Sequence, residues 1–136
     1  MDWMLLPYRR YFDFSGRSQR KEYWMFTLFY VLVAIVLAAV MILGLVGLEE
    51  GKKPGAAFWI GFAGLMVFLL GSVIPSIAVT VRRFHDQDLS GWLYLLGFIP
   101  SIGGIIILVF MCIEGTKGDN RFGYDPKGRG EAEVFA

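Results

Sequence analysis

The chain has 136 residues, of which 56% are hydrophobic and only 18% are charged, whereas charged residues make up about 25% of an average soluble domain. Its 13 Lys and Arg residues nearly balance its 12 Asp and Glu residues, so net charge gives no reason to expect a nucleic acid partner. The length fits one domain, and the composition excludes an ordinary soluble protein and indicates a membrane protein. The single cysteine, Cys112, excludes an internal disulfide.

The N-terminal stretch SGRSQRKEYW, residues 15–24, predicts an amphipathic helix at the membrane interface. Ser18 is suited to cap its start, and Arg17, Lys21 and Trp24 would then share one face. A basic and aromatic face of this kind suits the anionic lipid headgroups of the cytoplasmic leaflet, which we expect as partners of the N-terminal arm. We expect the helix chiefly to set topology, with Glu22 paired to a neighbouring arginine.

Three apolar segments follow, at residues 25–48, 56–81 and 92–113. Each is longer than the about 20 residues that a helix needs to cross a bilayer. The sequence therefore predicts an all-α, polytopic membrane protein with one integral-membrane domain over residues 1–127 and a disordered tail over 128–136. The first segment is too long, and too far from the N-terminus, for a cleavable signal peptide, so we expect it to remain as an anchor.

The connections between these segments are short and polar. Residues 49–55, EEGKKPG, and residues 86–91 supply the Gly, Pro and charged residues that end helices and allow tight reversals. Consecutive segments are therefore predicted to be antiparallel neighbours.

The distribution of basic residues predicts a cytoplasmic N-terminus, because Lys and Arg gather in cytoplasmic loops. Three full crossings would leave seven basic residues inside and six outside, which is almost no bias. If residues 92–113 instead dip into the membrane and return near Pro100, the count becomes eleven against two. We expect three spans because 22 apolar residues normally cross, with the re-entrant arrangement as the alternative.

The tetrapeptide IPSI occurs twice, at residues 74–77 and 99–102. Proline kinks a helix and removes one backbone hydrogen bond. One interpretation is a small polar cleft beneath the neighbouring charged connection, lined by Pro75, Ser76, Pro100 and Ser101. The other is that Pro and small residues are simply tolerated in membrane helices and allow close packing.

The stretch RRFHDQD, residues 82–88, places two arginines, the single histidine and two aspartates between apolar segments. His85 beside Asp86 could act as a general base, and Arg82 with Arg83 could hold a phosphate or carboxylate. No nucleophile is linked to these residues in a motif, and one histidine cannot supply the three or four ligands that zinc needs. We therefore expect no catalytic residues, metal or cofactor. A structural network with the other charged stretches is the favoured interpretation.

The C-terminal stretch EGTKGDNRFGYDP, residues 114–126, reads as successive turns. Arg121 could reach a carboxylate of an earlier charged stretch only if this segment lies on the same side of the membrane.

Three stretches together, FDFSGRSQRKEYWMF, VRRFHDQDLSGW and EGTKGDNRFGYDP, resemble the signatures of the domain of unknown function 805 family of small bacterial inner-membrane proteins. The resemblance covers residues 1–127 and implies a multi-pass protein of the bacterial inner membrane, with no assigned activity. The family-like positions are Gly16, Arg17, Arg20, Glu22, Tyr23, Trp24, Arg82, Arg83, His85, Asp86, Trp92, Gly115, Asn120, Arg121, Gly123, Asp125 and Pro126.

The sequence thus favours a non-enzymatic structural or interaction component, working as a homo-oligomer or with a membrane-protein partner. The alternative is a small transporter, channel or lipid- or anion-binding subunit that uses the Pro75/Pro100 cleft under the 82–88 loop. The candidate polar cluster comprises Arg17, Arg20, Glu22, Arg82, Arg83, His85, Asp86, Asn120, Arg121 and Asp125.

Overall fold

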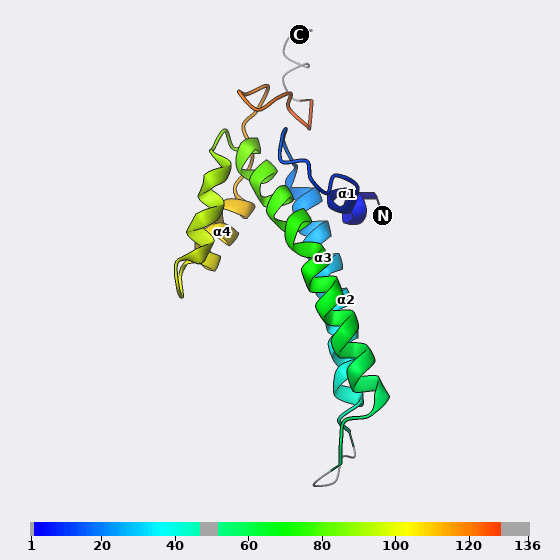
Figure 1. Cartoon of the computed structure of the whole chain (residues 1–136). Coiled ribbons are helices and arrows are strands. Elements are labelled where there is room, and N and C mark those ends of the chain that lie inside the picture. Colours follow the sequence, from blue (N-terminus) through cyan, green and yellow to red (C-terminus); the bar gives the residue numbers. More distant parts are fainter. Residues whose placement is uncertain (1, 47–51, 129–136) are drawn as a thin grey trace. The chain divides into compact units, whose positions relative to one another are not determined.

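The computed structural model describes residues 2–46 and 52–128, and within them the chain is helical (Figure 1). Its elements are α1 (Asp2–Arg9), α2 (Arg20–Leu43), α3 (Ala56–Asp86), the 3-10 helix η1 (Gly91–Phe98) and α4 (Gly103–Cys112). In the described ranges the β-type pairing is one isolated bridge between Asn120 and Gly123. The predicted all-α class is confirmed.

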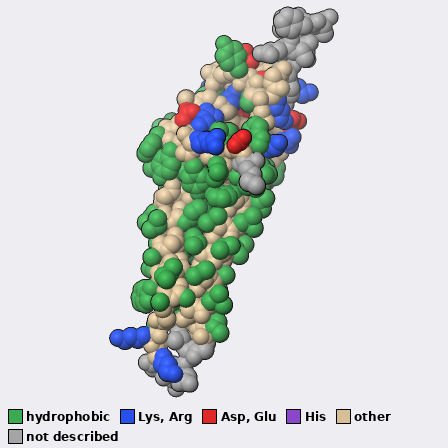
Figure 2. Space-filling view, turned by 90° about the vertical axis from the view of Figure 1, so that its right-hand side faces the viewer, with side chains coloured by type: hydrophobic (Ala, Val, Ile, Leu, Met, Phe, Trp, Pro, Cys, Tyr) green, Lys and Arg blue, Asp and Glu red, His purple; other side chains and the backbone are tan. Residues whose placement is uncertain are grey.

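The chain divides into two compact units. The first, which we call the polar unit, comprises Met1–Phe26 and Ile74–Ala136; the second, the hairpin unit, is Thr27–Val73. Helices α2 and α3 each contribute to both. Charged side chains gather in the polar unit, and hydrophobic side chains cover the hairpin unit (Figure 2). Residues 129–136 of the predicted tail, and residues 49–51 of the first predicted connection, lie outside the described residues.

Helices α2 and α3 are long and apolar enough to cross a membrane. Large hydrophobic side chains remain exposed along both, for example Ile35 at 59% and Val67 at 73%. Exposed apolar surface of this extent is stable only where hydrocarbon is the solvent, and a helix satisfies its own backbone groups there. Two of the three predicted apolar segments therefore form helices of spanning length.

The two helices pack antiparallel in the hairpin unit, as the short connection predicts. A Cβ atom built on Gly44 would lie 2.6 Å from Phe58 Cα, and one on Gly61 would lie 2.8 Å from Met41 Cα. The rings of Tyr30 and Phe68 contact each other with centroids 5.5 Å apart and planes tilted by 30°. Glycine at these crossings lets the two backbones approach closely, which is how helices associate in lipid.

Helix α3 runs five residues beyond the predicted segment end, so Arg82–Asp86 are helical and the predicted 82–88 loop is wrong over those residues. The helix ends in a Schellman motif: Leu89 N–H donates to the Phe84 carbonyl and Asp88 N–H to the His85 carbonyl. Asp88 adopts φ 57°, the left-handed conformation that this motif requires. The last turn of the continued helix carries residues that form buried ion pairs, described below.

The third apolar segment, residues 92–113, is not one helix. It forms η1 and α4, which pack against each other around a turn at residues 99–102. Pro100 ends the first helix, and Ser101 turns the chain at φ 69°. The bare backbone of Gly103 allows the close return, because a Cβ there would lie 2.7 Å from the Gly97 carbonyl oxygen. The described residues therefore contain two helices of spanning length instead of the expected three.

The predicted amphipathic helix over residues 15–24 is also wrong at its start. Helix α2 begins at Arg20, and Gly16 turns the preceding chain at φ 77°. Arg17 is therefore not on a helical face with Lys21 and Trp24; its side chain is 1% exposed and points into the polar unit. Ser18 is fully buried, and its hydroxyl accepts a hydrogen bond from Arg82 Nε at 2.9 Å. A separate short helix, α1, precedes this region.

Candidate functional site: a buried ionic network

The polar unit brings together three stretches that are far apart in the sequence: residues 10–22, 82–88 and 112–127. Two backbone hydrogen bonds tie the outer stretches to the end of α3. Ser18 N–H donates to the Arg82 carbonyl at 3.1 Å, and Thr116 N–H donates to the Asp86 carbonyl at 2.8 Å. The last turn of α3 is therefore the centre of this unit.

Arg82 connects the end of α3 to the N-terminal stretch. Its side chain is fully buried and donates to Glu22 Oε1 at 2.9 Å and to Ser18 Oγ at 2.9 Å. The remaining guanidinium nitrogen donates to the Asp13 and Arg10 carbonyls. Glu22 lies in the first turn of α2, so this pair fixes the start of α2 against the end of α3. The prediction that Glu22 pairs with a neighbouring arginine is wrong as to the partner, because Glu22 pairs with Arg82, 60 positions away.

Asp86 is shared by two arginines. Its Oδ1 accepts from Arg17 Nε at 3.0 Å, and its Oδ2 accepts from an Arg83 guanidinium nitrogen at 2.5 Å. Arg83, one turn earlier in α3, also donates to the Ile113 carbonyl at the end of α4. One carboxylate therefore links the N-terminal stretch, α3 and the hairpin of η1 and α4.

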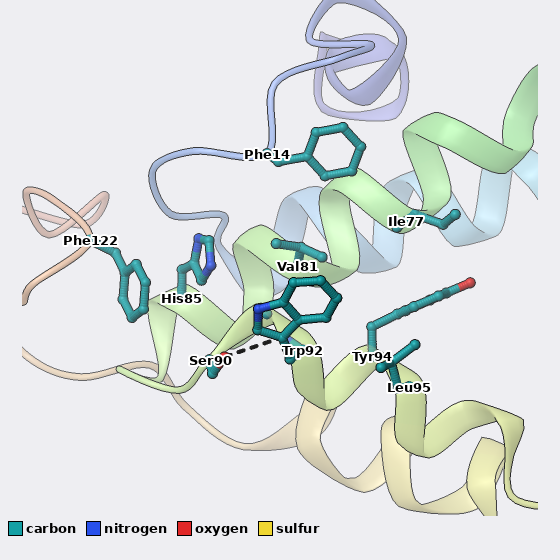
Figure 3. Close-up of a pocket in the computed structure, with 10 residues that line it drawn as sticks. Phe14, Ile77, Val81, His85, Ser90, Trp92, Tyr94, Leu95 and Phe122 are labelled. Carbon is teal, nitrogen blue, oxygen red and sulfur yellow. Dashed lines mark hydrogen bonds between the residues drawn. The ribbon is translucent and has the colours of Figure 1, made fainter.

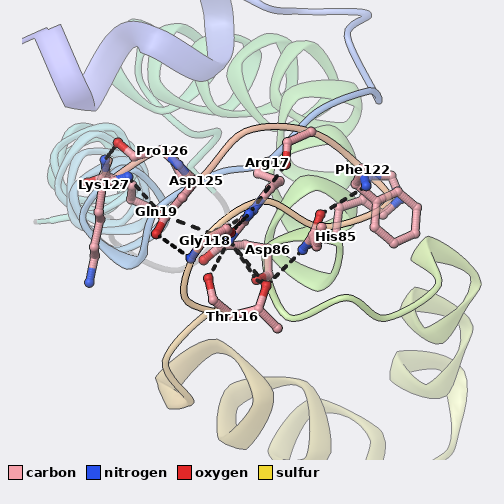
Figure 4. Close-up of polar contacts among 12 residues, drawn as sticks. Arg17, Gln19, His85, Asp86, Thr116, Gly118, Phe122, Asp125, Pro126 and Lys127 are labelled. Atoms are coloured by element: carbon pink, nitrogen blue, oxygen red, sulfur yellow. Dashed lines mark hydrogen bonds and ion pairs between the residues drawn. The ribbon is translucent and has the colours of Figure 1, made fainter. Parts of the chain in front are cut away.

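Arg17 extends the network into the C-terminal stretch (Figure 4). Its terminal nitrogens donate to the Thr116 carbonyl at 2.6 Å and to the Gly118 carbonyl at 2.7 Å. The Asp125 carboxylate lies 3.9 Å away and is itself held by the Gly118 N–H at 3.0 Å. Together with Asp86, these acceptors engage all three nitrogens of the Arg17 guanidinium.

The C-terminal stretch is further held by side-chain amides. Asn120 Nδ2 donates to the His85 carbonyl at 2.9 Å, and Asn120 Oδ1 accepts from the Phe122 N–H at 2.9 Å. Gln19 Nε2 donates to the Pro126 carbonyl at 2.5 Å. These bonds fix the turns that present carbonyl oxygens to Arg17.

The buried charges balance. The six buried ionic side chains of the described residues are three cations and three anions: Arg17, Arg82, Arg83, Glu22, Asp86 and Asp125. Removing charges from water is expensive unless partners and hydrogen bonds compensate, and removing one member of a buried pair typically costs about 3–5 kcal/mol. Local neutrality and nearly complete hydrogen bonding let this cluster remain buried.

His85 and Asp86 do not form the dyad that their adjacency suggested as one interpretation. Successive residues of a helix point about 100° apart, and the Asp86 carboxylate accepts from the two arginines. His85 Nδ1 instead lies 3.1 Å from the Gly16 carbonyl, and its ring stacks on Phe122 with centroids 4.0 Å apart. No group of three or more His, Cys, Asp or Glu residues converges on a metal-binding geometry within 2–46 and 52–128.

Two predicted members lie at the exposed rim. Arg20 donates to the Cys112 carbonyl at 3.2 Å and lies 3.6 Å from Glu114. Arg121 lies 3.2 Å from the Asp88 carboxylate, with side chains 61% and 45% exposed. The C-terminal stretch thus reaches a carboxylate of the 82–88 stretch.

The four residues of the predicted proline cleft do not come together to line one cleft. Pro75 is buried inside α3, and Ser76 uses its carbonyl to accept from Thr80 Oγ1 at 2.7 Å. Pro100 and Ser101 are exposed in the turn between η1 and α4. None of the four residues lines the two cavities described next. Pro100 lies in the turn that joins η1 to α4 and does not face α3.

The structure instead has a cavity of about 510 Å³ beside the network, lined by His85, by Ser90 and by apolar or aromatic side chains of four segments (Figure 3). A second cavity, of about 540 Å³, is lined by Arg20, Lys21, Trp24, Met25 and Cys112. Sequence reasoning missed both, and it also missed the role of Thr116, Gly118 and Ile113, because a backbone carbonyl acceptor leaves no mark in residue type.

Comparison with known proteins agrees with the resemblance seen in the sequence. The chain is 45% identical to the inner membrane protein YhaH of Escherichia coli strain K12 over 129 residues, covering 93% of this chain and 98% of YhaH. It is 42% identical to the inner membrane protein YhaI of the same strain over 127 residues, covering 93% and 97%. The uncharacterized protein YiiR of that strain is 29% identical over 140 residues, covering 84% and 86%.

No solved structure matches the chain significantly. Residues 11–124 match the family model described as a protein of unknown function, DUF805, and this range contains nearly all of the ionic network. The chain therefore belongs to the DUF805 family of membrane proteins.

Proposed function

We propose that this chain is a non-enzymatic structural or interaction component of the bacterial inner membrane, in which the ionic network locks the ends of its membrane helices together. One observation carries the proposal: the terminal nitrogens of all three buried guanidinium groups donate to acceptors of the chain itself, and among the buried side-chain nitrogen and oxygen atoms of the described residues only Arg83 Nε has no partner. Arg17 and Arg82 use all their nitrogens in this way. An arginine that binds or activates a substrate needs free donors facing a cavity.

Hydrogen exchange in lipid nanodiscs tests this role. If the network is a single structural element, Arg82→Gln should increase amide exchange in residues 13–22, 82–88 and 114–126 together, because the three stretches depend on the same contacts. The exposed pair offers a matched control, since Arg121→Gln removes a cation whose partner is solvated.

An anion site predicts a different pattern. In that case inorganic phosphate would protect the three stretches of the wild-type chain, and Arg82→Gln would abolish the protection without changing basal exchange. That result would contradict the structural role.

We also propose a topology: a cytoplasmic N-terminus, two crossings by α2 and α3, and a re-entrant hairpin of η1 and α4 that returns the C-terminal stretch to the cytoplasmic side. The contacts among the three charged stretches support it, since they require one side for all. The charge count also supports it, because only Lys52 and Lys53 of the 13 basic residues would face the periplasm.

Reporter fusions test the topology. A cytoplasm-active reporter should be active at either terminus and inactive when inserted after Lys53. A C-terminal fusion that is active only with a periplasmic reporter would exclude the re-entrant hairpin and restore three crossings.

Anionic lipid headgroups are the partners that we propose for the N-terminal arm. The second cavity places Arg20 and Lys21 beside Trp24 and Met25, which combines cations with an apolar wall. Each well-placed cation adds about 1 kcal/mol at an anionic surface.

Phosphatidylglycerol added to phosphatidylcholine nanodiscs should therefore raise the unfolding temperature, and Lys21→Gln should reduce that gain. Lys117→Gln is the control for charge alone, because Lys117 is exposed and does not line this cavity. Equal loss in both variants would contradict a local headgroup site.

A further inference from the structure

The cavity of about 510 Å³ beside the network is built by all three charged stretches and by η1. Phe14 comes from the N-terminal stretch, Val81 and His85 from α3, Trp92 and Leu95 from η1, and Phe122 from the C-terminal stretch (Figure 3). Its volume falls in the range of about 300–1,000 Å³ that is usual for small-molecule sites. The ionic network accounts for the charged residues of these stretches, but it leaves this wall of aromatic side chains unexplained.

The cavity opens at the boundary between polar and apolar surface. Trp92 is 79% exposed and Leu95 is 53% exposed, and both lie on η1 together with the exposed Phe98. The cavity adjoins the ionic network through His85, the residue before Asp86. A molecule with a hydrocarbon body and a polar end matches this gradient.

His85 supplies a directed polar group. Its Nδ1 lies 3.1 Å from the Gly16 carbonyl oxygen, which can only accept, so the proton of the neutral ring is on Nδ1. Nε2 is then an acceptor. The flat stack on Phe122, with rings 4° apart in plane, fixes the direction in which Nε2 points.

The backbone of Gly91 packs closely against Val81 and the His85 ring. A Cβ built on Gly91 would lie 3.2 Å from His85 Nε2 and 2.6 Å from Val81 Cγ1. Glycine at the start of η1 therefore keeps a side chain from pressing against Val81 and the Nε2 edge of the imidazole.

We propose that this cavity binds a membrane-dissolved amphiphile that carries a hydroxyl group, with the hydroxyl donating to His85 Nε2 and the hydrocarbon body lying against Phe14, Trp92 and Leu95. The acceptor character of Nε2 selects a donor and rejects a carboxylate or an ester, which cannot donate. The site goes beyond the structural role of the network, since none of its buried arginines lines the cavity.

The single histidine of the chain makes the test direct, because labelling histidine with ¹⁵N marks one imidazole. In phosphatidylcholine nanodiscs, whose headgroups have no donor, the spectrum at pH 7.5 should show a protonated Nδ1 and a bare Nε2. Monooleoylglycerol should shift the Nε2 signal in a saturable way and leave Nδ1 protonated. Methyl oleate, which has the same acyl chain without a hydroxyl, should leave both signals in place.

Variants on one helix separate the cavity from general lipid effects. Leu95→Trp fills the cavity and should abolish the shift, whereas Phe98→Trp, on η1 but outside the lining, should keep it. The Nδ1 signal of each variant reports whether the hydrogen bond to the Gly16 carbonyl persists. If Leu95→Trp loses that bond, Leu95→Ala takes its place, and this variant should bind the amphiphile more weakly.

Three results would overturn the proposal: a proton on Nε2 in the wild-type chain, an equal shift with methyl oleate, or no shift with monooleoylglycerol. Glycerol alone tests the source of the ligand, because a shift of equal size at the same concentration would exclude a membrane-dissolved amphiphile. Failure here leaves the hydrogen-exchange test of the network unaffected, so the two proposals can fail separately.

Discussion

Arg17 and Asp86 lie 69 positions apart in the sequence and form an ion pair of 3.0 Å in which the side chains are 1% and 4% exposed. The pair joins the segment before the first membrane helix to the last turn of the second. Through the same guanidinium group it also holds the Thr116 and Gly118 carbonyls. One contact therefore determines how three distant segments come together.

We predict that Arg17→Gln strongly destabilises the polar unit. It would leave the Asp86 and Asp125 carboxylates buried with one cation fewer, a loss that typically costs about 3–5 kcal/mol. Chemical unfolding in nanodiscs, followed by exchange of residues 82–88, measures the change. Arg9→Gln is the control, because the Arg9–Asp2 pair of 3.8 Å is largely exposed and should be almost neutral. Equal effects of the two variants would contradict a special role for the buried pair.

Gly115 should not tolerate a side chain. A Cβ at this position would lie 2.8 Å from the Asp86 carbonyl oxygen and still closer to its carboxylate. Gly115→Ala should therefore displace the C-terminal stretch from α3 and lower the unfolding temperature. Gly104→Ala, where a Cβ meets nothing within 4 Å, should be neutral or stabilise α4 by about 0.5–1 kcal/mol. The prediction fails if the Gly115 variant unfolds at the wild-type temperature.

A second glycine pair tests the hairpin unit. Gly61→Ala should separate α2 from α3, because the added Cβ would meet the Met41 backbone, which cannot rotate away. Gly71→Ala, on the same helix, adds a Cβ that meets nothing within 4 Å. A Cβ built on Gly64 would lie 3.2 Å from Leu37 Cδ2, so disulfide cross-linking between cysteines placed at Leu37 and Gly64 should slow in the first variant and not in the second. Unchanged cross-linking in both would argue against close packing at Gly61.

Asp13 should titrate well below its ordinary range. Its carboxylate accepts from Ser15 Oγ at 2.6 Å and from Arg10 Nε at 2.8 Å. The hydrogen bond from Ser15 is the largest cause, and with the Arg10 contacts it lowers the pKa of Asp13 from 3.8 to about 2. Because the pKa is lower in the folded chain, the turn at residues 10–15 gains stability above pH 3.8 and loses it as the pH falls toward 2.

Carboxyl ¹³C shifts measure this titration. They are followed from about pH 1.5 to about pH 6, a range that includes both the lowered pKa and the ordinary pKa of Asp13. Ser15→Ala should raise the pKa of Asp13 toward 3.8, whereas Ser101→Ala, in the exposed turn of the hairpin, should not change it. A wild-type midpoint near 3.8 would show that the Ser15 and Arg10 contacts do not persist in solution.

The sequence predicts the parts of this fold whose free energy depends on local composition. The length of an apolar run decides whether a helix can lie in hydrocarbon, and α2 and α3 follow from that alone. Their antiparallel packing follows from the short connection. The three charged stretches could be named as one cluster, because charge is excluded from the apolar segments and must gather at their ends.

Only the tertiary structure decided which charges pair. Asp86 is adjacent to His85 in sequence yet bonds Arg17 and Arg83, because the helix turns the two side chains apart and the chain path brings Arg17 to it. The continuation of α3 to Asp86 places Arg82, Arg83 and Asp86 in the same distant contacts. The free energy of transferring a helix into lipid is a sum over consecutive residues, so it can be estimated from the sequence. The stability of a buried ion pair depends on where all of its other partners lie in the folded chain.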